Sequence, residues 1–284
     1  WSRADARQSF APSMLAQPDE HATSFPPEAP SEAPVDVLAS LREHVLLAEQ
    51  GEGEFPQKEV FGAHLSACAS SGDWETACSL LDLMPSALVA VEGAHYTSAI
   101  RACRRAGEWR CAMTLLQDAR SLGLKFNHFA YSHVVDSCDA AGQGEEAMQA
   151  YVLGVQDGAI CHWNEEEPFS IDLHGFSERT AAVAVRYVLR HELGNYIHED
   201  LKIITGQGRH SEGDPLVLPR IRRLLEEELE PPLPYEIDQT LECDERDCKL
   251  RDNPGCLRVA LQELLDWLMK TRPFESYVIN LSPV

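Results

Sequence analysis

The chain has 284 residues, 44% of them apolar, which suffices for one or two domains with hydrophobic cores. Charged residues interrupt every apolar run before the length of about 18 residues that a membrane-spanning helix needs, so a membrane protein is excluded. The formal net charge of −22 counts against general nucleic-acid binding, because affinity for phosphates comes from Lys and Arg. Any nucleic-acid site must therefore be a local patch.

Two features bear on the compartment. Because the chain begins with Trp1, we expect it to be a fragment or a processed form, with any targeting segment upstream. The nine cysteines are irregularly spaced, unlike the dense framework of a small disulfide-bonded protein. We therefore expect reduced thiols in the cytosol, the nucleus or an organelle matrix.

The first part of the chain leads into a repeat region. Residues 1–34 are rich in Pro, Ser, Ala and acidic side chains and are predicted to be a disordered arm or linker. In 35–57 the apolar side chains recur with a helical period, at Val37, Leu38, Leu41, Val45 and Leu46. Because Leu46 precedes Leu81 by 35 residues, this segment is predicted to be a degenerate repeat or a helical cap.

Residues 58–164 repeat with a period of 35 residues. The positions that share this period are Phe61, Tyr96 and Tyr131; Cys68, Cys103 and Cys138; Gly72, Gly107 and Gly142; Ala77, Ala112 and Ala147; and Trp74 and Trp109. Each unit is predicted to be a helical hairpin in which the glycine ends the first helix. Such a hairpin cannot bury its apolar face alone, so the copies are predicted to stack into an α-solenoid.

The stretch from Tyr96 to Ser132 resembles a pentatricopeptide repeat, with its Cys-Arg-Arg-Ala-Gly-Glu-Trp core and its Gly-Leu-Lys-Phe-Asn junction. In that family, the residue after the opening aromatic and the last residue of the repeat read one RNA base together. The resemblance implies three such pairs, which are Thr97 with Asn127, Ser132 with His162, and Gly62 with Glu92. The first pair fits the family's usual residue types and implies a preference for adenine. The other two are irregular.

Single-stranded RNA is the partner that this resemblance implies. Four arginines of the second repeat favour it, namely Arg101, Arg104, Arg105 and Arg110, although a basic helix face is often merely solvated. The alternative is that the repeat surface binds a protein, and that the chain is a non-catalytic scaffold in organellar gene expression.

After residue 164 the pattern changes from all-helical to alternating strand and helix, which predicts a second domain over 165–284. Strands at 169–173 and 201–205, joined by a helix that starts after Ser177 and ends at Gly194, are predicted to form a parallel crossover. A helix carrying Ile221, Leu224, Leu225 and Leu229, weaker strands at 235–239 and 256–259, and a helix at 261–270 complete an open α/β sandwich.

Two polar clusters follow the predicted parallel strands, where ligand sites collect in such sheets. Asp172 and His174 lie two residues apart and are predicted to share one face. The second cluster is a glycine-rich loop whose backbone N–H groups could hold a phosphate, and its predicted binding residues are Thr205, Gly206, Gly208, Arg209 and His210.

These clusters resemble the Leu-Asp-x-His and Thr-Gly-x-Gly signatures of the Smr (small MutS-related) domain over residues 168–281, with Ile171 in place of Leu. The resemblance implies binding of RNA or DNA and, as in several family members, endonuclease activity. Together with the repeats it implies an RNA-processing protein of the chloroplast or mitochondrion.

Phosphodiester cleavage needs a proton acceptor and stabilisation of the charged transition state. His174 is predicted to be the general base or acid, with Asp172 orienting it or binding a divalent metal such as Mg. The alternative is that Asp172 caps the turn and His174 makes a structural hydrogen bond, in a binding domain without turnover.

The cysteines at 243, 248 and 256 suggest zinc, but they lack a close fourth ligand and the usual pair spacing. The stretch 242–248 is therefore predicted to be a solvated loop.

Overall fold

A computed structural model describes residues 37–167, 169–193, 197–206, 216–244 and 247–271, without the side chains of 240–252 and 254. The chain divides into two compact units, 1–125 and 126–284, which are described separately below. Among the described residues, no helix has both the length and the apolar character required to cross a membrane.

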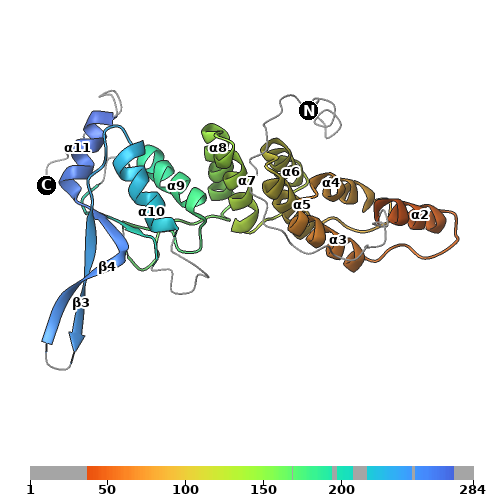
Figure 1. The fold of residues 1–284 in the computed structure, drawn as a ribbon, viewed down its shortest axis with the longest axis horizontal. Coiled ribbons are helices and arrows are strands. Elements are labelled where there is room, and N and C mark those ends of the chain that lie inside the picture. Colours follow the sequence, from red (N-terminus) through yellow and green to blue (C-terminus); the bar gives the residue numbers. More distant parts are fainter. Residues whose placement is uncertain (1–36, 168, 194–196, 207–215, 245–246, 272–284) are drawn as a thin grey trace, which may run out of the picture. The chain divides into compact units, whose positions relative to one another are not determined.

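The described part of the first unit, residues 37–125, is helical. Its helices are α2 (Val37–Glu49), α3 (Lys58–Ser71), α4 (Trp74–Leu83), α5 (Gly93–Ala106) and α6 (Trp109–Ser121), labelled in Figure 1. The helices α3 and α5 begin 35 residues apart, as do α4 and α6, which confirms the predicted period. Because α5 packs against both α3 and α4, the two hairpins stack on each other.

The repeated residues have the predicted structural roles. Gly72 and Gly107 end α3 and α5 in the left-handed conformation, with φ of 86° and 77°. The repeated aromatic, Cys and Ala side chains are buried; in this unit they are Phe61, Tyr96, Cys68, Cys103, Ala77 and Ala112. The small Cys and Ala side chains permit close contact between the helices.

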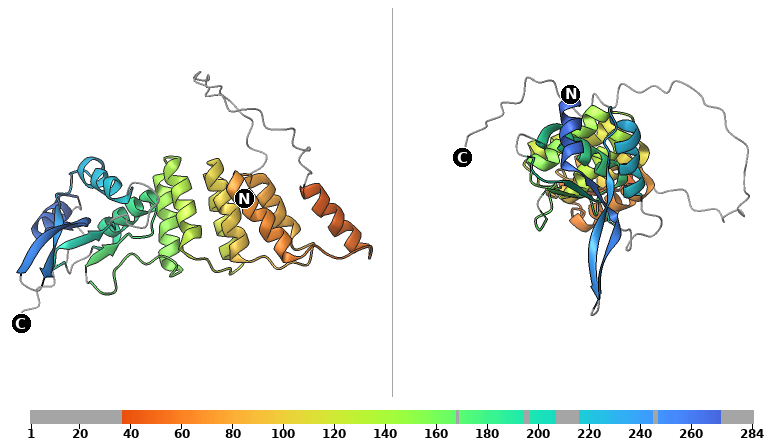
Figure 2. Two further views of the ribbon diagram at one scale, coloured as in Figure 1. Left: turned by 60° about the horizontal axis from the view of Figure 1, so that its bottom comes forward. Right: turned by 90° about the vertical axis from the view of Figure 1, so that its left-hand side faces the viewer.

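The second unit begins with a further hairpin, α7 (His128–Ala140) and α8 (Gly144–Gln156), which keeps the 35-residue step. Both helices pack against α9 (Glu178–Tyr187), as the two views of Figures 1 and 2 show. The compact units therefore divide before this hairpin, whereas the sequence pattern changes from helical to alternating after residue 164.

The sheet of the second unit has four strands in the order β1-β2-β4-β3. Their bounds are β1 (Ser170–Asp172), β2 (Leu201–Ile204), β3 (Glu236–Asp244) and β4 (Asp247–Val259). The pair β1 and β2 is parallel, as predicted, and β4 runs antiparallel to both β2 and β3. The sheet is therefore mixed.

Three helical segments accompany the sheet. α9 continues into a π-helical turn, Val188–Glu192; α10 (Val217–Arg223) continues into another, Leu224–Glu228; and α11 (Leu261–Thr271) follows β4. The predicted helix stripes are buried, including Val185, Ile221 and Leu225. Ser177 caps α9 by accepting a hydrogen bond from the N–H of Thr180 at 3.1 Å, as predicted.

One prediction in this domain is wrong. The stretch 242–248, predicted to be a loop, lies mostly in β3 and β4, which pair in register from Gln239 with Asp252 to Asp244 with Asp247. The charged residues of this segment hid its strands, because the two-residue alternation of apolar side chains that marks a strand is weak there. The register between β3 and β4 shifts between Ile237 and Gln239.

Candidate functional site

Asp172 and His174 form a hydrogen-bonded pair at the carboxyl end of β1. The Nδ1 of His174 lies 2.5 Å from Oδ1 of Asp172, which also accepts the backbone N–H of His174 at 3.0 Å. The His174 side chain is 77% exposed, and that of Asp172 is 20% exposed. Gly175, with φ of 82°, turns the chain directly after this pair.

The second predicted cluster begins beside this pair. The N–H of Leu173 donates to the carbonyl of Ile204 at 2.8 Å, which ties the ends of β1 and β2 together. Gly206 follows in the left-handed conformation, with φ of 74°. A Cβ placed on Gly206 would lie 3.9 Å from the Cβ of His174. The structure thus brings His174 and Gly206 together from two segments of the chain.

Thr205 is buried at this edge. Its N–H and its hydroxyl both donate to the carbonyl of Gly255 on β4, at 2.9 and 3.2 Å. These bonds fix Thr205 at the start of the glycine-rich loop, and its binding role stays a prediction. Gly255 was not predicted, because an antiparallel register cannot be read from local sequence. Gly208, Arg209 and His210 lie outside the described residues.

The geometry assigns roles to the two imidazole nitrogens of His174. A carboxylate can only accept, so Nδ1–H donates to Asp172 and the neutral ring carries its lone pair on Nε2. The two hydrogen bonds to Asp172 also restrain the orientation of the ring. An exposed and oriented Nε2 is suited to accept a proton from a bound hydroxyl.

The described donors alone do not form a metal centre. No three His, Cys, Asp or Glu side chains group around a common point in the described ranges. Mg²⁺ takes oxygen ligands, and Asp172 supplies one carboxylate that already accepts two hydrogen bonds from His174. A magnesium ion here would need phosphate oxygens and water, so this cofactor stays a prediction.

The first predicted base-reading pair spans the division between the units. Thr97 lies half-buried in α5, where its hydroxyl donates to the carbonyl of Gly93 at 2.8 Å. Asn127 is exposed and precedes α7 without making a side-chain cap. Both residues are open to solvent to some degree, so their base-reading role stays a prediction.

The third repeat offers no such pair on its surface. Ser132 is 7% exposed, and its hydroxyl has no hydrogen-bond partner among the described groups. His162 is 2% exposed and lies between the hydroxyl of Tyr151 at 3.0 Å and the carboxylate of Glu192 at 2.8 Å. These two side chains are packed inside the second unit.

In the remaining predicted pair, Gly62 with Glu92, the Glu92 carboxylate is bonded to a lysine. Glu92 accepts a hydrogen bond from Lys58 at 2.5 Å, and this bond holds the pKa of Glu92 below its usual value. Gly62 has open space around its Cα. Glu92 thus joins α5 to α3, and a base would have to compete with Lys58 for it.

The basic residues of α5 face solvent. Arg101, Arg104 and Arg105 are exposed, and the Arg110 guanidinium lies 4.6 Å from the centroid of the Trp109 ring. Residues 93–125 carry six basic and two acidic side chains, in a protein of net charge −22. This segment is therefore the local basic patch that phosphate binding requires.

The comparisons with known proteins agree with this part of the molecule. The family model described as PPR repeat matches residues 65–87 and 94–124, that is, most of the two hairpins of the first unit. No curated protein matches the chain. The chain thus contains pentatricopeptide repeats within residues 65–124, and such repeats imply RNA binding.

Proposed function

We propose that the protein binds single-stranded RNA through its pentatricopeptide repeats and cleaves it at the Asp172–His174 pair of an Smr-type domain, in an organelle. The repeat match and the basic patch of residues 93–125 support the first part. One observation supports the second. An exposed, carboxylate-bonded histidine lies beside a left-handed glycine at the ends of two parallel strands.

The proposed reaction uses the hydroxyl of the RNA itself. The Nε2 of His174 accepts the proton of the 2′-hydroxyl, and the 2′-oxygen bonds to the adjacent phosphorus. The bond from phosphorus to the 5′-oxygen breaks, and that oxygen takes a proton from solvent. The product then carries a 2′,3′-cyclic phosphate. Gly206 lets the phosphate approach the backbone closely, and Arg209 would neutralise its charge.

The test is cleavage of labelled single-stranded RNA by the full chain, with and without a chelator. Removing a general base costs about 10²- to 10⁴-fold in rate, so His174→Ala and Asp172→Asn should lose cleavage while RNA affinity stays nearly constant. His198→Ala is the matched control, because His198 is also exposed and lies 3.6 Å from a carboxylate oxygen of Glu199.

The analysis of product ends identifies the route. Cyclic phosphate ends and resistance to chelation support direct attack by the 2′-hydroxyl. Loss of cleavage on chelation supports metal binding through Asp172 instead. If the wild-type protein cleaves neither RNA nor DNA, with or without divalent metal, the cleavage proposal is wrong and the domain is a binding domain without turnover.

The alternative function is the protein-binding scaffold, which the net charge of −22 favours. Filter binding with a salt titration separates the two. RNA binding through phosphates gives an affinity that falls with salt, by a slope of about 0.7 per contact on single strands. A scaffold would show no such binding at physiological salt.

A further inference from the structure

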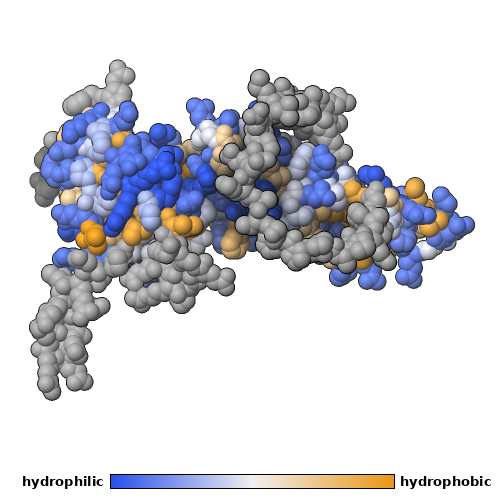
Figure 3. Space-filling model, in the orientation of Figure 1, coloured by the Kyte–Doolittle hydropathy of each residue, from blue (hydrophilic) through white to orange (hydrophobic). Residues whose placement is uncertain are grey.

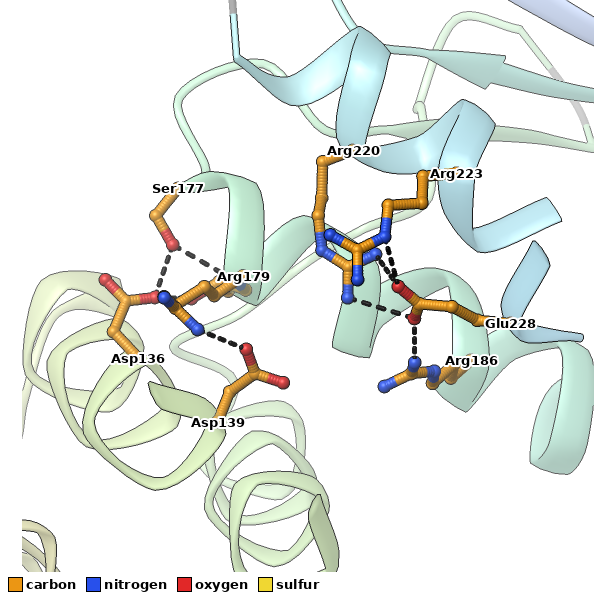
Figure 4. A network of polar contacts seen from close by, with 9 residues as sticks. Asp136, Asp139, Ser177, Arg179, Arg186, Arg220, Arg223 and Glu228 are labelled. Atoms are coloured by element: carbon orange, nitrogen blue, oxygen red, sulfur yellow. Dashed lines mark hydrogen bonds and ion pairs between the residues drawn. The ribbon is translucent and has the colours of Figure 1, made fainter. Parts of the chain in front are cut away.

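The α7–α8 hairpin carries a buried carboxylate that is bonded to the start of α9. Asp136 is 5% exposed, and it accepts hydrogen bonds from the hydroxyls of Ser177 and Thr180, the latter at 3.0 Å (Figure 4). Burial of a carboxylate is costly unless hydrogen bonds satisfy it, and a negative charge is favourable at a helix N-terminus. Asp136 therefore holds the side chain of Ser177, the residue that caps α9.

A second carboxylate lies one turn further along the same face of α7. Asp139 accepts a hydrogen bond from Arg179 at 2.9 Å, and its side chain is 14% exposed (Figure 4). Asp136 and Asp139 stand 35 residues after Arg101 and Arg104, so the repeat positions that carry exposed arginines in α5 carry acidic side chains in α7. This face of α7 is therefore acidic where the equivalent face of α5 is basic. It contacts α9 of the same chain instead of solvent.

The segment after α8 is bonded both to β1 and to the π-helical turn after α9. The carbonyl of His162 accepts the N–H of Asp172 at 2.7 Å, while the His162 ring bonds to Glu192, the last residue of the π-helical turn after α9. The indole N–H of Trp163 donates to the same carboxylate at 2.6 Å. Burial, more than any nearby charge, raises the pKa of Tyr151, which therefore bonds to His162 as a neutral phenol.

These contacts hold the chain on both sides of the candidate site. Asp172 is bonded through its backbone to His162, and Ser177 comes three residues after His174, beyond the turn at Gly175. The chain between Asp172 and Ser177 is thus held at both ends by groups of the α7–α8 hairpin and its following segment.

We propose that Asp136 is a positioning residue for the Asp172–His174 pair, and that the α7–α8 hairpin supports this site instead of reading an RNA base. The base-reading positions of the third repeat, Ser132 and His162, are buried, which fits this use. The cleavage readout of this proposal rests on the function proposed above. Its structural readouts need no RNA.

The test compares Asp136→Ala with Asp139→Ala in the full chain. Each removes one carboxylate from the same face of α7, but only Asp136 bonds to the cap of α9. NMR of the His174 imidazole should show a weakened Nδ1–H hydrogen bond to Asp172 in Asp136→Ala only. Amide exchange at Leu173 and Thr180 should accelerate about tenfold or more.

Asp136→Asn should keep the wild-type Nδ1–H signal and the wild-type amide exchange, because the amide oxygen of asparagine can still accept both hydroxyls. If Asp136→Ala does not fold, Thr180→Val decides, since it removes one hydroxyl donor and leaves the Ser177 cap. With cleavage as readout, Asp136→Ala should lower kcat and leave KM unchanged.

An Asp136→Ala or Thr180→Val protein with a wild-type His174 Nδ1–H signal and wild-type amide exchange would overturn the proposal, even if His174→Ala abolishes cleavage. Conversely, suppose that the wild-type protein cleaves nothing but that the variants show the expected NMR and exchange changes. The positioning role of Asp136 would then be supported, and the proposed cleavage function would be wrong.

Discussion

The α5–α6 and α7–α8 hairpins are successive copies of the same 35-residue repeat, and they differ in the charge of one helix face. Both bury the same aromatic, Cys and Ala positions, which are Tyr96 and Tyr131, Cys103 and Cys138, and Ala112 and Ala147. The face of α5 presents Arg101 and Arg104 to solvent, whereas the face of α7 presents Asp136 and Asp139 to α9. The two hairpins therefore share one core, while the equivalent helix face is exposed and basic in α5 and acidic and bonded to α9 in α7.

Hydrophilic side chains gather over α9 and α10 on the face shown in Figure 3. Part of this surface is already paired, because Glu228 accepts hydrogen bonds from Arg186 and from Arg220, at 2.8 Å for the shorter Arg220 bond (Figure 4). Arg186 and Arg220 thus bind a carboxylate of their own unit.

The shared core predicts the largest effect, which is on thiol reactivity. Cys68, Cys103 and Cys138 are buried, and burial raises the pKa of Cys68 to about 11 and that of Cys138 to about 12. Because labelling requires local opening, these thiols should react at least about 100-fold more slowly than the exposed Cys161. Mass spectrometry after timed alkylation of the native protein measures this ratio, and equal rates would mean that the repeat register is wrong.

The next effect is specific to the third hairpin. A Cβ on Gly154 would lie 2.6 Å from Cδ1 of Ile160 and 2.9 Å from Cγ of Tyr131, whereas the equivalent position of α6 is Ala119. Gly154→Ala should therefore destabilise the second unit by about 1–3 kcal/mol. Gly144→Ala is the control in the same helix, since its Cβ meets nothing within 4 Å. Urea unfolding measures both, and a neutral Gly154→Ala would contradict the packing.

The charge reversal itself can be copied into the second hairpin. Arg101→Asp together with Arg104→Asp should weaken binding to single-stranded RNA about tenfold or more, and should flatten the salt dependence by a slope of about 1.4 for two lost contacts. Arg179→Ala, which breaks the pair with Asp139, should leave this slope unchanged. Equal salt slopes in all three proteins would place the RNA elsewhere.

The smallest effect concerns the start of α5. His95 accepts the N–H of Glu92 through Nδ1 at 3.0 Å, and burial lowers its pKa. A histidine with a lowered pKa in the folded state favours folding above its unfolded pKa of about 6.5, and this stability is lost as the pH falls below that value. The melting temperature of the first unit should fall between pH 7 and 5, and less so in His95→Gln, which keeps an acceptor that does not titrate.

The sequence was most informative where a period dictated the structure. The step of 35 residues located the helices of all three hairpins, and Gly72 and Gly107 marked the helix ends because they adopt a left-handed conformation. The two-residue spacing of Asp172 and His174 also predicted that their side chains would lie together.

Long-range partners could not be predicted in the same way. Asp136 reads as an ordinary polar residue of a repeat, and only the packing of α9 against α7 gives it Ser177 and Thr180. The ribbon of β3 and β4 and the bond from Thr205 to Gly255 depend on a register shift that local sequence does not encode.

The comparison of the two hairpins is tested most directly by base preference. The affinity of the full chain should be measured for a set of single-stranded RNAs in which each position carries each of the four bases in turn. Thr97→Ala should lose the preference for adenine at one position, because its hydroxyl no longer contributes to recognition. Ser132→Ala should keep the wild-type profile, because that hydroxyl is buried. A profile altered at any position by Ser132→Ala would contradict the account.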